Sequence, residues 1–297
     1  MKLITSQNIY SNTLAEYQSS KLLSSQKLRR IADTKYSDIY KLLLDFGYNG
    51  DYLNINSYDV DLFLSKQIKQ LAKFIKETAT LNALAKILLN PFYYSDAKAI
   101  YKKQFSDTEV TLYLDLDNPL GVDTNAIIED LGENPTAKEI DLAFTKAMHN
   151  ENLLLAKQIS PTFIEYTKTQ IDIDNILSLY RSSRMGYNKE NAREELIEGG
   201  NISLEEFTSL DNLLDNPIFE ESLTALITND ITNFRSLTNE ILLDILKKNT
   251  TNFLSFGPFI KYILAQIAEY DSVRQILIAK KNNLSLNINS FGGYDDL

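Results

Sequence analysis

The sequence contains no cysteine and only one histidine. Without cysteine the chain has neither disulfides nor thiolate metal sites, which fits a cytosolic protein. The single histidine, His149, lies near an expected helix end and gives no basis for a Ser-His-Asp or Cys-His arrangement. We therefore interpret His149 as a surface residue or as a residue whose ring is satisfied by its neighbours.

Glycine is also scarce, with 10 in 297 residues. Phosphate loops need clustered glycines so that backbone N–H groups can approach the anion, and the chain has neither G-x-G-x-x-G nor G-x-x-x-x-G-K-[ST]. We expect no nucleotide site and no cofactor. Residues Met1–Asn8 lack the apolar core of a signal peptide. No apolar run approaches the roughly 18 residues that span a bilayer, so we expect any membrane association to go through a partner or a surface.

Two acidic clusters, Asp115–Asn118 and Asp172–Asn175, resemble the start of a calcium-binding loop. Such a loop needs glycine at its sixth position and a bidentate glutamate at its twelfth. Leu120 occupies the sixth position of the first cluster, and the second runs into an apolar helix pattern. We expect no metal site. Paired carboxylates for acid–base catalysis are equally unsupported, because nothing fixes their separation.

What the sequence does have is helical periodicity. Apolar residues between Leu64 and Ile75 are spaced 4, 3 and 4 apart, which predicts one face of a helix. Asn90-Pro91 is expected to end that helix, because proline disfavours the helical conformation for its predecessor. Ser160-Pro161 and Asn216-Pro217 each place a capping side chain before a proline at the first helical position.

Further signals predict helix ends and one short connector. Gly257-Pro258 predicts the start of a long helix, and Gly199-Gly200 the end of the helix that includes Asn191–Glu198. Ser203 and Glu206 fit a capping box. Val110–Leu114 is the one strand-like stretch, and we interpret it as a connector. The sequence therefore predicts an all-α fold.

Three segments share one pattern of an acidic start, a small polar residue, an apolar pair and a basic end: Tyr93–Lys103, Ile171–Arg184 and Glu269–Lys281. Tyr101 recurs as Tyr180 after 79 residues, and Tyr180 aligns with Leu277 after a further 97. A period this long indicates one small domain per copy, although chance matches arise easily in a helical chain. We predict three similar small helical domains with pseudo-threefold internal repetition, residues 1–108 (basic), 109–210 (acidic) and 211–297.

Charge is distributed unevenly. Residues 1–106 carry 15 Lys and Arg against 9 Asp and Glu, whereas residues 107–297 carry 15 against 31. Lys66, Lys69, Lys73 and Lys76 form a basic stripe at helical spacing. The stripe is either a solvated helix face or a surface for anionic headgroups or an acidic protein. Because the basic part is only mildly basic, we expect no nucleic-acid partner.

Four segments together resemble a known family: the C subunit of bacterial and archaeal V-type (A/V-type) rotary ATPases, the counterpart of the eukaryotic d subunit. Their order and spacing span nearly the whole chain. They are Tyr17–Leu23 followed by Ile39–Tyr48, similar to a "KLL … L-x-x-x-G-Y" pattern; Asp172–Arg181, similar to "D-x-x-N-I-x-x-L-x-R"; Glu198–Ser203, similar to "G-G-x-[IL]-[ST]"; and Phe256–Pro258 with Glu269–Arg274 and Lys280, similar to "G-P … E-x-x-N-[VL]-R".

The resemblance implies an all-α, three-domain, funnel-like protein in the central rotor, or central stalk. It implies a peripheral position on the cytoplasmic face of the membrane, in one copy per complex, between the shaft subunits and the membrane proteolipid ring. The implied role is mechanical coupling during ATP-linked proton or sodium transport, with no catalytic site of its own. Two positions depart from the family pattern: Ser272 stands where the family usually has asparagine, and the tail Asn287–Leu297 lacks the usual arginine-containing ending.

Four basic residues, Arg181, Arg184, Arg274 and Lys280, lie at corresponding ends of the repeated helices. They either line a shared face that contacts the shaft, or neutralise helix C-termini and pair with local carboxylates. Two further interpretations of the whole chain stay open, a generic all-helical scaffold or adaptor and a small all-α enzyme. A deep pocket with convergent polar groups would favour the enzyme.

Overall fold

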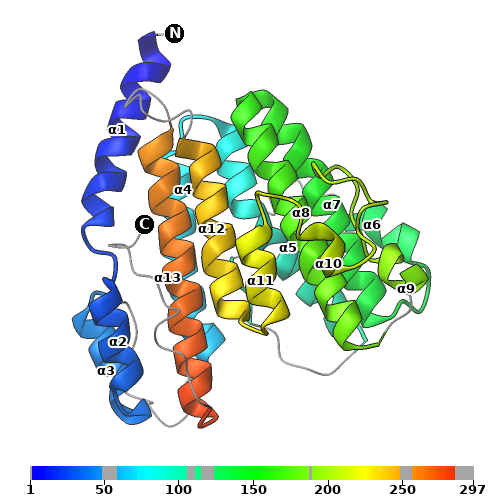
Figure 1. Ribbon diagram of the computed structural model, residues 1–297. Coiled ribbons are helices and arrows are strands. Elements are labelled where there is room, and N and C mark those ends of the chain that lie inside the picture. The colour runs from blue at the N-terminus through cyan, green and yellow to red at the C-terminus, as the bar shows by residue number, and fades with distance from the viewer. Residues whose placement is uncertain are drawn as a thin grey trace. The chain divides into compact units, whose positions relative to one another are not determined.

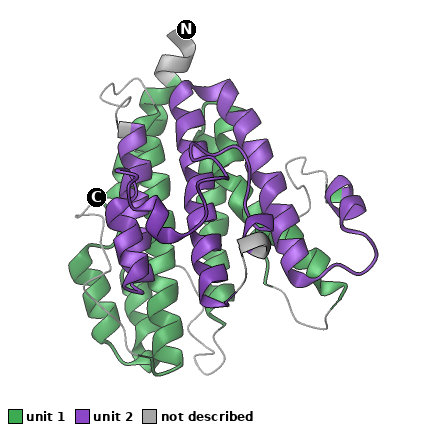
Figure 2. Cartoon of the chain, turned by 45° about the vertical axis from the view of Figure 1, so that its right-hand side comes forward, with its two compact units in different colours: residues 1–124, 250–297 green, residues 125–249 purple. Residues whose placement is uncertain are grey.

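The fold is known from a computed structural model, which describes residues 2–48, 59–105, 111–114, 124–186, 189–247 and 256–284. Thirteen helices and no strand are present among these residues, so the all-α prediction is confirmed (Figure 1). The chain divides into two compact units (Figure 2). Unit 1 comprises residues 1–124 and 250–297, and unit 2 comprises residues 125–249.

Unit 1 joins the two ends of the chain around one long helix, α13. Its helices are α1 (Lys2–Ser19), α2 (Ser25–Asp33), α3 (Tyr36–Asp45), α4 (Val60–Thr78), α5 (Asn82–Lys103) and α13 (Gly257–Lys281). Helix α13 packs against α1, α2, α3 and α4. Their shared core includes Leu43, Phe63 and Val273, each at most 3% exposed. Because α13 is separated from α5 in the sequence by the whole of unit 2, the core of unit 1 joins segments that lie far apart along the chain.

Unit 2 is a continuous stretch of helices. It contains α7 (Ala137–Ile159), α8 (Pro161–Arg184), α9 (Lys189–Glu194), α10 (Leu210–Leu213), α11 (Glu220–Ile227) and α12 (Ile231–Lys247), with α6 (Thr124–Leu131) at its start. Helices α7 and α8 pack as a hairpin, and α12 packs on both α8 and α11 (Figure 1). Helix α8 is the axis of the unit, and Phe163, Ile171 and Ile176 are buried on it.

The predicted helix over Leu64–Ile75 and two predicted helix starts are confirmed. Ser160 caps α8 by accepting from the Phe163 N–H at 3.3 Å, and Pro161 occupies its first turn. Gly257 and Pro258 begin α13. At Asn216-Pro217 the outcome differs. The Asn216 side chain accepts from the Ile218 N–H at 3.0 Å, but residues 217–219 form a turn and α11 begins at Glu220.

The prediction at Asn90-Pro91 is wrong. Helix α4 ends earlier, at Thr78, and a separate helix, α5, runs through Pro91. An internal proline costs about 3 kcal/mol. Here it is tolerated because α5 buries Leu84, Leu88 and Leu89 on its inner side. Burial of a helix face therefore outweighs the local preference.

Three weaker signals correspond to loops. Helix α9 ends at Glu194, before Gly199-Gly200. The Ser203 N–H donates to Glu206 Oε1 at 3.2 Å, which is half of a capping box, but residues 204–208 form a turn. Of Val110–Leu114, residues 111–114 are described and contain no strand. The three-domain division, the pseudo-threefold repetition and the funnel-like shape stay predictions.

Candidate functional site: buried carboxylates and exposed basic residues

Asp172, in the middle of α8, binds the backbone of a loop 30 residues further along the chain. Its Oδ2 accepts from the Asn201 N–H at 3.0 Å and its Oδ1 from the Ile202 N–H at 3.1 Å. One turn along α8, Asn175 makes two hydrogen bonds of 2.8 Å with the backbone of Ile197, one as donor and one as acceptor. Together the two side chains fix the loop of residues 197–202 on α8.

The two glycines of this loop allow the close approach. Gly199 has φ +101°, a left-handed conformation that glycine adopts without strain. A Cβ on Gly200 would lie 2.1 Å from Asp172 Oδ1, much closer than a carbon and an oxygen approach without a covalent bond. The two glycines that were predicted to end a helix therefore lie in a loop, where they contact α8.

Burial raises the pKa of Asp172 to about 6, while the N–H groups of Asn201 and Ile202 oppose the rise. The side chain is fully buried. Because its carboxylate accepts from two backbone N–H groups of a distant loop, this aspartate acts as a structural clamp.

Glu269 is the corresponding carboxylate of unit 1. It lies on α13 and accepts from the Leu23 N–H, from the Tyr48 hydroxyl at 2.7 Å and from Gln266 Nε2 at 3.0 Å. Burial raises its pKa, and the bonds from Leu23 and Tyr48 act in the opposite direction. Burial and the adjacent Glu269 raise the pKa of Tyr48 well above its ordinary value. This cluster ties the α1–α2 connection to α13.

Asp96 on α5 makes a third contact of the same kind. Its two oxygens accept from the N–H groups of Tyr113 at 2.8 Å and Leu114 at 2.6 Å. Asp96, Asp172 and Glu269 are all buried, and each lies on one of the three helices that carry the proposed repeat. Asp172 and Glu269 are 97 residues apart, the spacing between the second and third copies. Asp96 lies 76 residues before Asp172, not the 79 that separate the first two copies, so the repeat stays a prediction.

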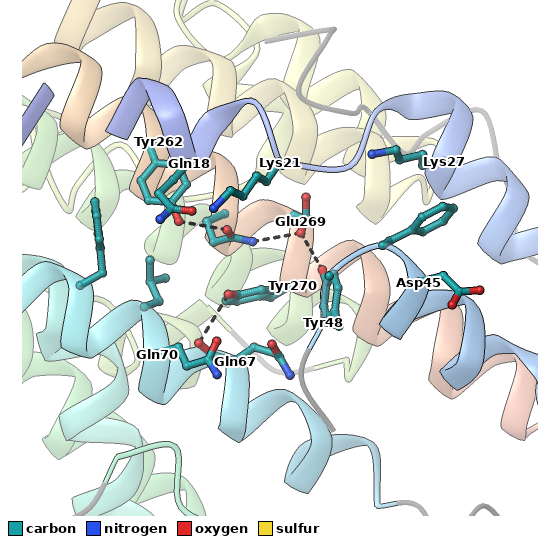
Figure 3. Close-up of a pocket in the computed structure, with 15 residues that line it drawn as sticks. Gln18, Lys21, Lys27, Asp45, Tyr48, Gln67, Gln70, Tyr262, Glu269 and Tyr270 are labelled. Atoms are coloured by element: carbon teal, nitrogen blue, oxygen red, sulfur yellow. Dashed lines mark hydrogen bonds between the residues drawn. The ribbon is translucent and has the colours of Figure 1, made fainter. Parts of the chain in front are cut away.

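A pocket of about 640 Å³ opens beside Glu269 within unit 1 (Figure 3). Tyr48, Tyr262 and Tyr270 line it together with glutamines of α1, α4 and α13. The charged side chains of Lys21, Lys27 and Asp45 and several apolar residues also belong to the lining. Tyr262 bonds Gln266 at 3.2 Å, and Gln266 bonds Glu269. The carboxylate of Glu269 thus accepts hydrogen bonds from residues of the pocket wall.

The basic stripe lies on α4. Lys66, Lys73 and Lys76 are exposed and Lys69 is half-buried. Lys73 Nζ is 3.9 Å from the Glu77 carboxylate, and Lys76 Nζ lies 5.6 Å above the Tyr93 ring. The spacing on one helix face is as predicted, and the partner for it stays a prediction.

The four basic residues at the helix ends differ in their surroundings. Arg274 Nε donates to Asp61 Oδ1 at 2.8 Å, so it pairs with a carboxylate of its own unit. Lys280 is half-buried in the last turn of α13. Arg181 and Arg184 are exposed at the end of α8, and Arg181 Nε donates to its own helix at the Leu177 carbonyl. A face shared by all four stays a prediction.

His149 is buried, and its Nε2 lies 2.7 Å from Asp174 Oδ2. Among the described residues, no group of three or more histidine or acidic side chains could hold a metal ion. The first calcium-like cluster, Asp115–Asn118, lies outside the described residues. No described helix is long and apolar enough to cross a membrane.

Sequence reasoning placed Asp96, Asp172 and Glu269 in the repeated segments and weighed Asp172 as a calcium ligand. It predicted neither their bonds to distant backbone N–H groups nor any role for Asp61. A usable signal was present, because D-x-x-N at residues 172–175 is followed by G-G-x-I at residues 199–202. The signal for Asp61 is absent, since its partner Arg274 is 213 residues away.

Comparison with known proteins gives two matches. A family model described as "ATP synthase (C/AC39) subunit" matches residues 10–288. A curated relative, the C subunit of the A-type ATP synthase of Methanococcoides burtonii, is 25% identical over 143 residues. That alignment covers 43% of this chain and 40% of the relative, so the chain matches less than half of the relative's length.

Proposed function

The chain belongs to the family of ATP synthase (C/AC39) subunits, and we propose that it is a non-catalytic rotor subunit of a V/A-type ATPase. In this role it couples the shaft subunits to the membrane proteolipid ring during ATP-linked transport of protons or sodium ions. It acts as a peripheral subunit at the cytoplasmic face of the membrane, in one copy per complex. The family match over residues 10–288 is the observation that carries the proposal.

The buried carboxylates support a mechanical role. A protein that couples rotation must transmit force without unfolding locally, so its loops have to be fixed to its helices. Asp172 and Glu269 do this in the two units by binding backbone N–H groups of distant segments. Hydrogen bonds to a charged acceptor contribute about 1.5–3 kcal/mol each, more than neutral ones.

The exposed lysines of α4 supply a contact surface. Lys66, Lys73 and Lys76 extend from one side of the helix, and a cationic stripe of this kind attracts an acidic or polar partner surface over a Debye length of about 8 Å at physiological salt. Attachment through them is therefore expected to weaken as salt rises.

The test is affinity purification of the full chain from detergent-solubilised membranes, with the co-purifying subunits identified by mass. The proposal predicts both shaft and proteolipid subunits in the eluate. Recovery of the chain with unrelated soluble proteins, and with neither set of subunits, would contradict it and favour a generic scaffold.

Charge reversal sharpens the same experiment. Replacing Lys66, Lys69, Lys73 and Lys76 by glutamate is expected to lower recovery of the partner subunits at low salt, because attraction becomes repulsion. Arg193→Glu, in unit 2, is the matched control and is expected to leave recovery unchanged. Equal recovery by the stripe variant at low and high salt would exclude the stripe as a contact.

A further inference from the structure

The pocket beside Glu269 has the size and the wall chemistry of a small-molecule site. Its volume of about 640 Å³ lies within the range of about 300–1,000 Å³ that is usual for ligand and cofactor pockets. Every residue that lines it belongs to unit 1. Figure 3 shows Lys21 and Lys27 on one side of the pocket and Gln70 on the opposite side, with Tyr270 between them. Positive, aromatic and amide groups therefore line the same pocket.

The two lysines place their positive charges beside aromatic rings. Lys21 Nζ lies 4.2 Å from the centre of the Tyr17 ring, and Lys27 Nζ lies 5.4 Å from the centre of the Phe46 ring. Arg30 adds a third cation at 5.8 Å from the same phenylalanine, which also lines the pocket. In the described part of the chain, none of the three cations forms an ion pair with a carboxylate. Their charges are therefore available to an anion.

Carboxylates also line the pocket, but they do not cancel the positive charge of its α1–α2 side. Glu269 is 8% exposed, and its carboxylate already accepts three hydrogen bonds. Burial raises the pKa of Glu269, and the charge of Lys27 is one of the influences that lower it. Asp45 is exposed at the end of α3. Residues 17–35, which contribute the α1–α2 side, carry five Lys and Arg against one Asp, so an anion is attracted to that side.

The rest of the lining suits the flat, polar ring of a nucleic-acid base. Phe74 and Tyr270 are half-buried lining residues, so part of each side chain stays accessible. Aromatic side chains stack on bases of any kind, because every base has a π face. Gln18 and Gln70 line the same pocket, and a glutamine amide can donate and accept at the edge of a base at once. Lysine ammonium groups are common ligands of phosphate.

We propose that this pocket of unit 1 binds a nucleotide, with the phosphates at Lys21 and Lys27 and the base against the aromatic rings and glutamines of the opposite wall. Binding alone is proposed, and no bond of the nucleotide breaks. The sequence excludes only the glycine-rich type of nucleotide site, and here ammonium groups replace the backbone N–H groups of such a loop. A nucleotide in this pocket contacts α1, α2, α4 and α13 at once, so it stabilises the part of unit 1 where distant segments meet.

Isothermal titration calorimetry of the purified full chain tests the pocket with three probes. ATP is expected to bind at one molecule per chain with a Kd below about 1 mM. Tripolyphosphate, which lacks the base, and adenosine, which lacks the phosphates, are each expected to bind at least about tenfold more weakly. Equal affinity for ATP and tripolyphosphate would reduce the site to attraction between charges and would overturn the proposal, as would the absence of ATP binding.

Removing the two lysine charges tests the phosphate contacts. Lys21→Gln combined with Lys27→Gln is expected to weaken ATP binding by about tenfold or more, because two charge-assisted contacts are lost. Lys157→Gln combined with Lys168→Gln removes the same charge from unit 2 and is the matched control, with unchanged affinity expected. All four side chains are at least partly exposed, so both variants are expected to fold. An unchanged affinity in the first variant, or an equal loss in both, would contradict the proposal.

Photolabelling with an azido derivative of ATP locates the bound base. The label is expected in the α4 peptide that contains Gln70 and Phe74 or in the α13 peptide that contains Tyr270, and excess ATP is expected to prevent it. Labelling confined to unit 2 would overturn the site. These outcomes are independent of the proposed function, which fails when the chain purifies without shaft or proteolipid subunits, whatever its affinity for ATP.

Discussion

The two units use the same kind of contact on very different chain segments and with different charge. Glu269 in unit 1 binds Leu23 across 246 residues, whereas Asp172 in unit 2 binds Ile202 across 30. Unit 1 is almost neutral, with 19 Lys and Arg against 18 Asp and Glu, while unit 2 carries 11 against 22. A buried carboxylate can thus fix either a local loop or the joining of the chain ends. The charge difference also separates the acidic unit 2 from unit 1, which carries the lysine stripe.

The largest expected effect separates the two units directly. Asp172→Ala leaves the N–H groups of Asn201 and Ile202 without their acceptor, and we expect a loss of about 3–4 kcal/mol in the free energy of unfolding. Glu269→Ala is expected to cost about 2–3 kcal/mol, because the Tyr48 hydroxyl can rotate to another acceptor. Hydrogen exchange is the measurement, with lost protection confined to unit 2 in the first variant and to unit 1 in the second.

Glu221→Ala is a control for both, since this exposed side chain of α11 is expected to change stability by less than about 1 kcal/mol. If either buried carboxylate variant loosened both units equally, the comparison would fail.

A somewhat smaller effect is expected from Gly200→Ala. The added methyl group would meet Asp172 Oδ1, so the loop must move away from α8 and one hydrogen bond lengthens. We expect about 2–3 kcal/mol of destabilisation in urea unfolding. Gly132→Ala has open space around its Cβ but a φ of +73°, so only backbone strain of about 1 kcal/mol is expected. A smaller loss of stability for Gly200→Ala than for Gly132→Ala would contradict the close approach of the Gly200 backbone to Asp172.

The pH dependence of unit 2 follows from Asp172. Its pKa is about 6 in the folded chain against 3.8 for an ordinary aspartate, so the folded state binds the proton more tightly than the unfolded state. Stability from this group is therefore gained as pH falls from about 7 toward 4, and is lost as pH rises through 6. The expected change is about 1–3 kcal/mol. Urea unfolding at pH 7.5 and 4.5 measures it, and Asp172→Asn is expected to abolish this contribution.

The smallest effect concerns the pair of Arg274 and Asp61. Both side chains are partly exposed, at 42% and 38%, so water screens their attraction. Arg274→Ala is expected to cost about 0.5–1 kcal/mol, most of it recovered as coupling in a double-mutant cycle with Asp61→Ala. Coupling above about 3 kcal/mol would place this pair among the main contacts of unit 1, together with Glu269.

Some local signals in the sequence predicted local structure correctly. Ser160-Pro161 and Gly257-Pro258 begin the helices expected of them, because capping and a fixed φ depend on adjacent residues alone. Pro91 was misleading because its cost is offset by burial of α5, which no local pattern reveals. The ends of α9 and of the Ser203 turn were also misjudged, since the loop there is held by Asp172 and Asn175 from α8.

The contacts that build the candidate sites depend on distant residues. The partner of Arg274 is 213 residues away, and Glu269 meets Tyr48 across 221. The exposed Arg181 and Arg184 were predicted as interface residues from their place at a helix end. The packing of α8 against α12 and the bond from the Tyr180 hydroxyl to Asn229 join segments that no local pattern brings together.

The most direct test of the coupling role compares ATP hydrolysis with ion transport in membrane vesicles from cells that lack this chain. Rotor coupling predicts that ATP is still hydrolysed while ATP-driven ion uptake is lost, and that adding back the purified chain restores uptake. Undiminished ion uptake in its absence would contradict a role in transmitting rotation to the membrane.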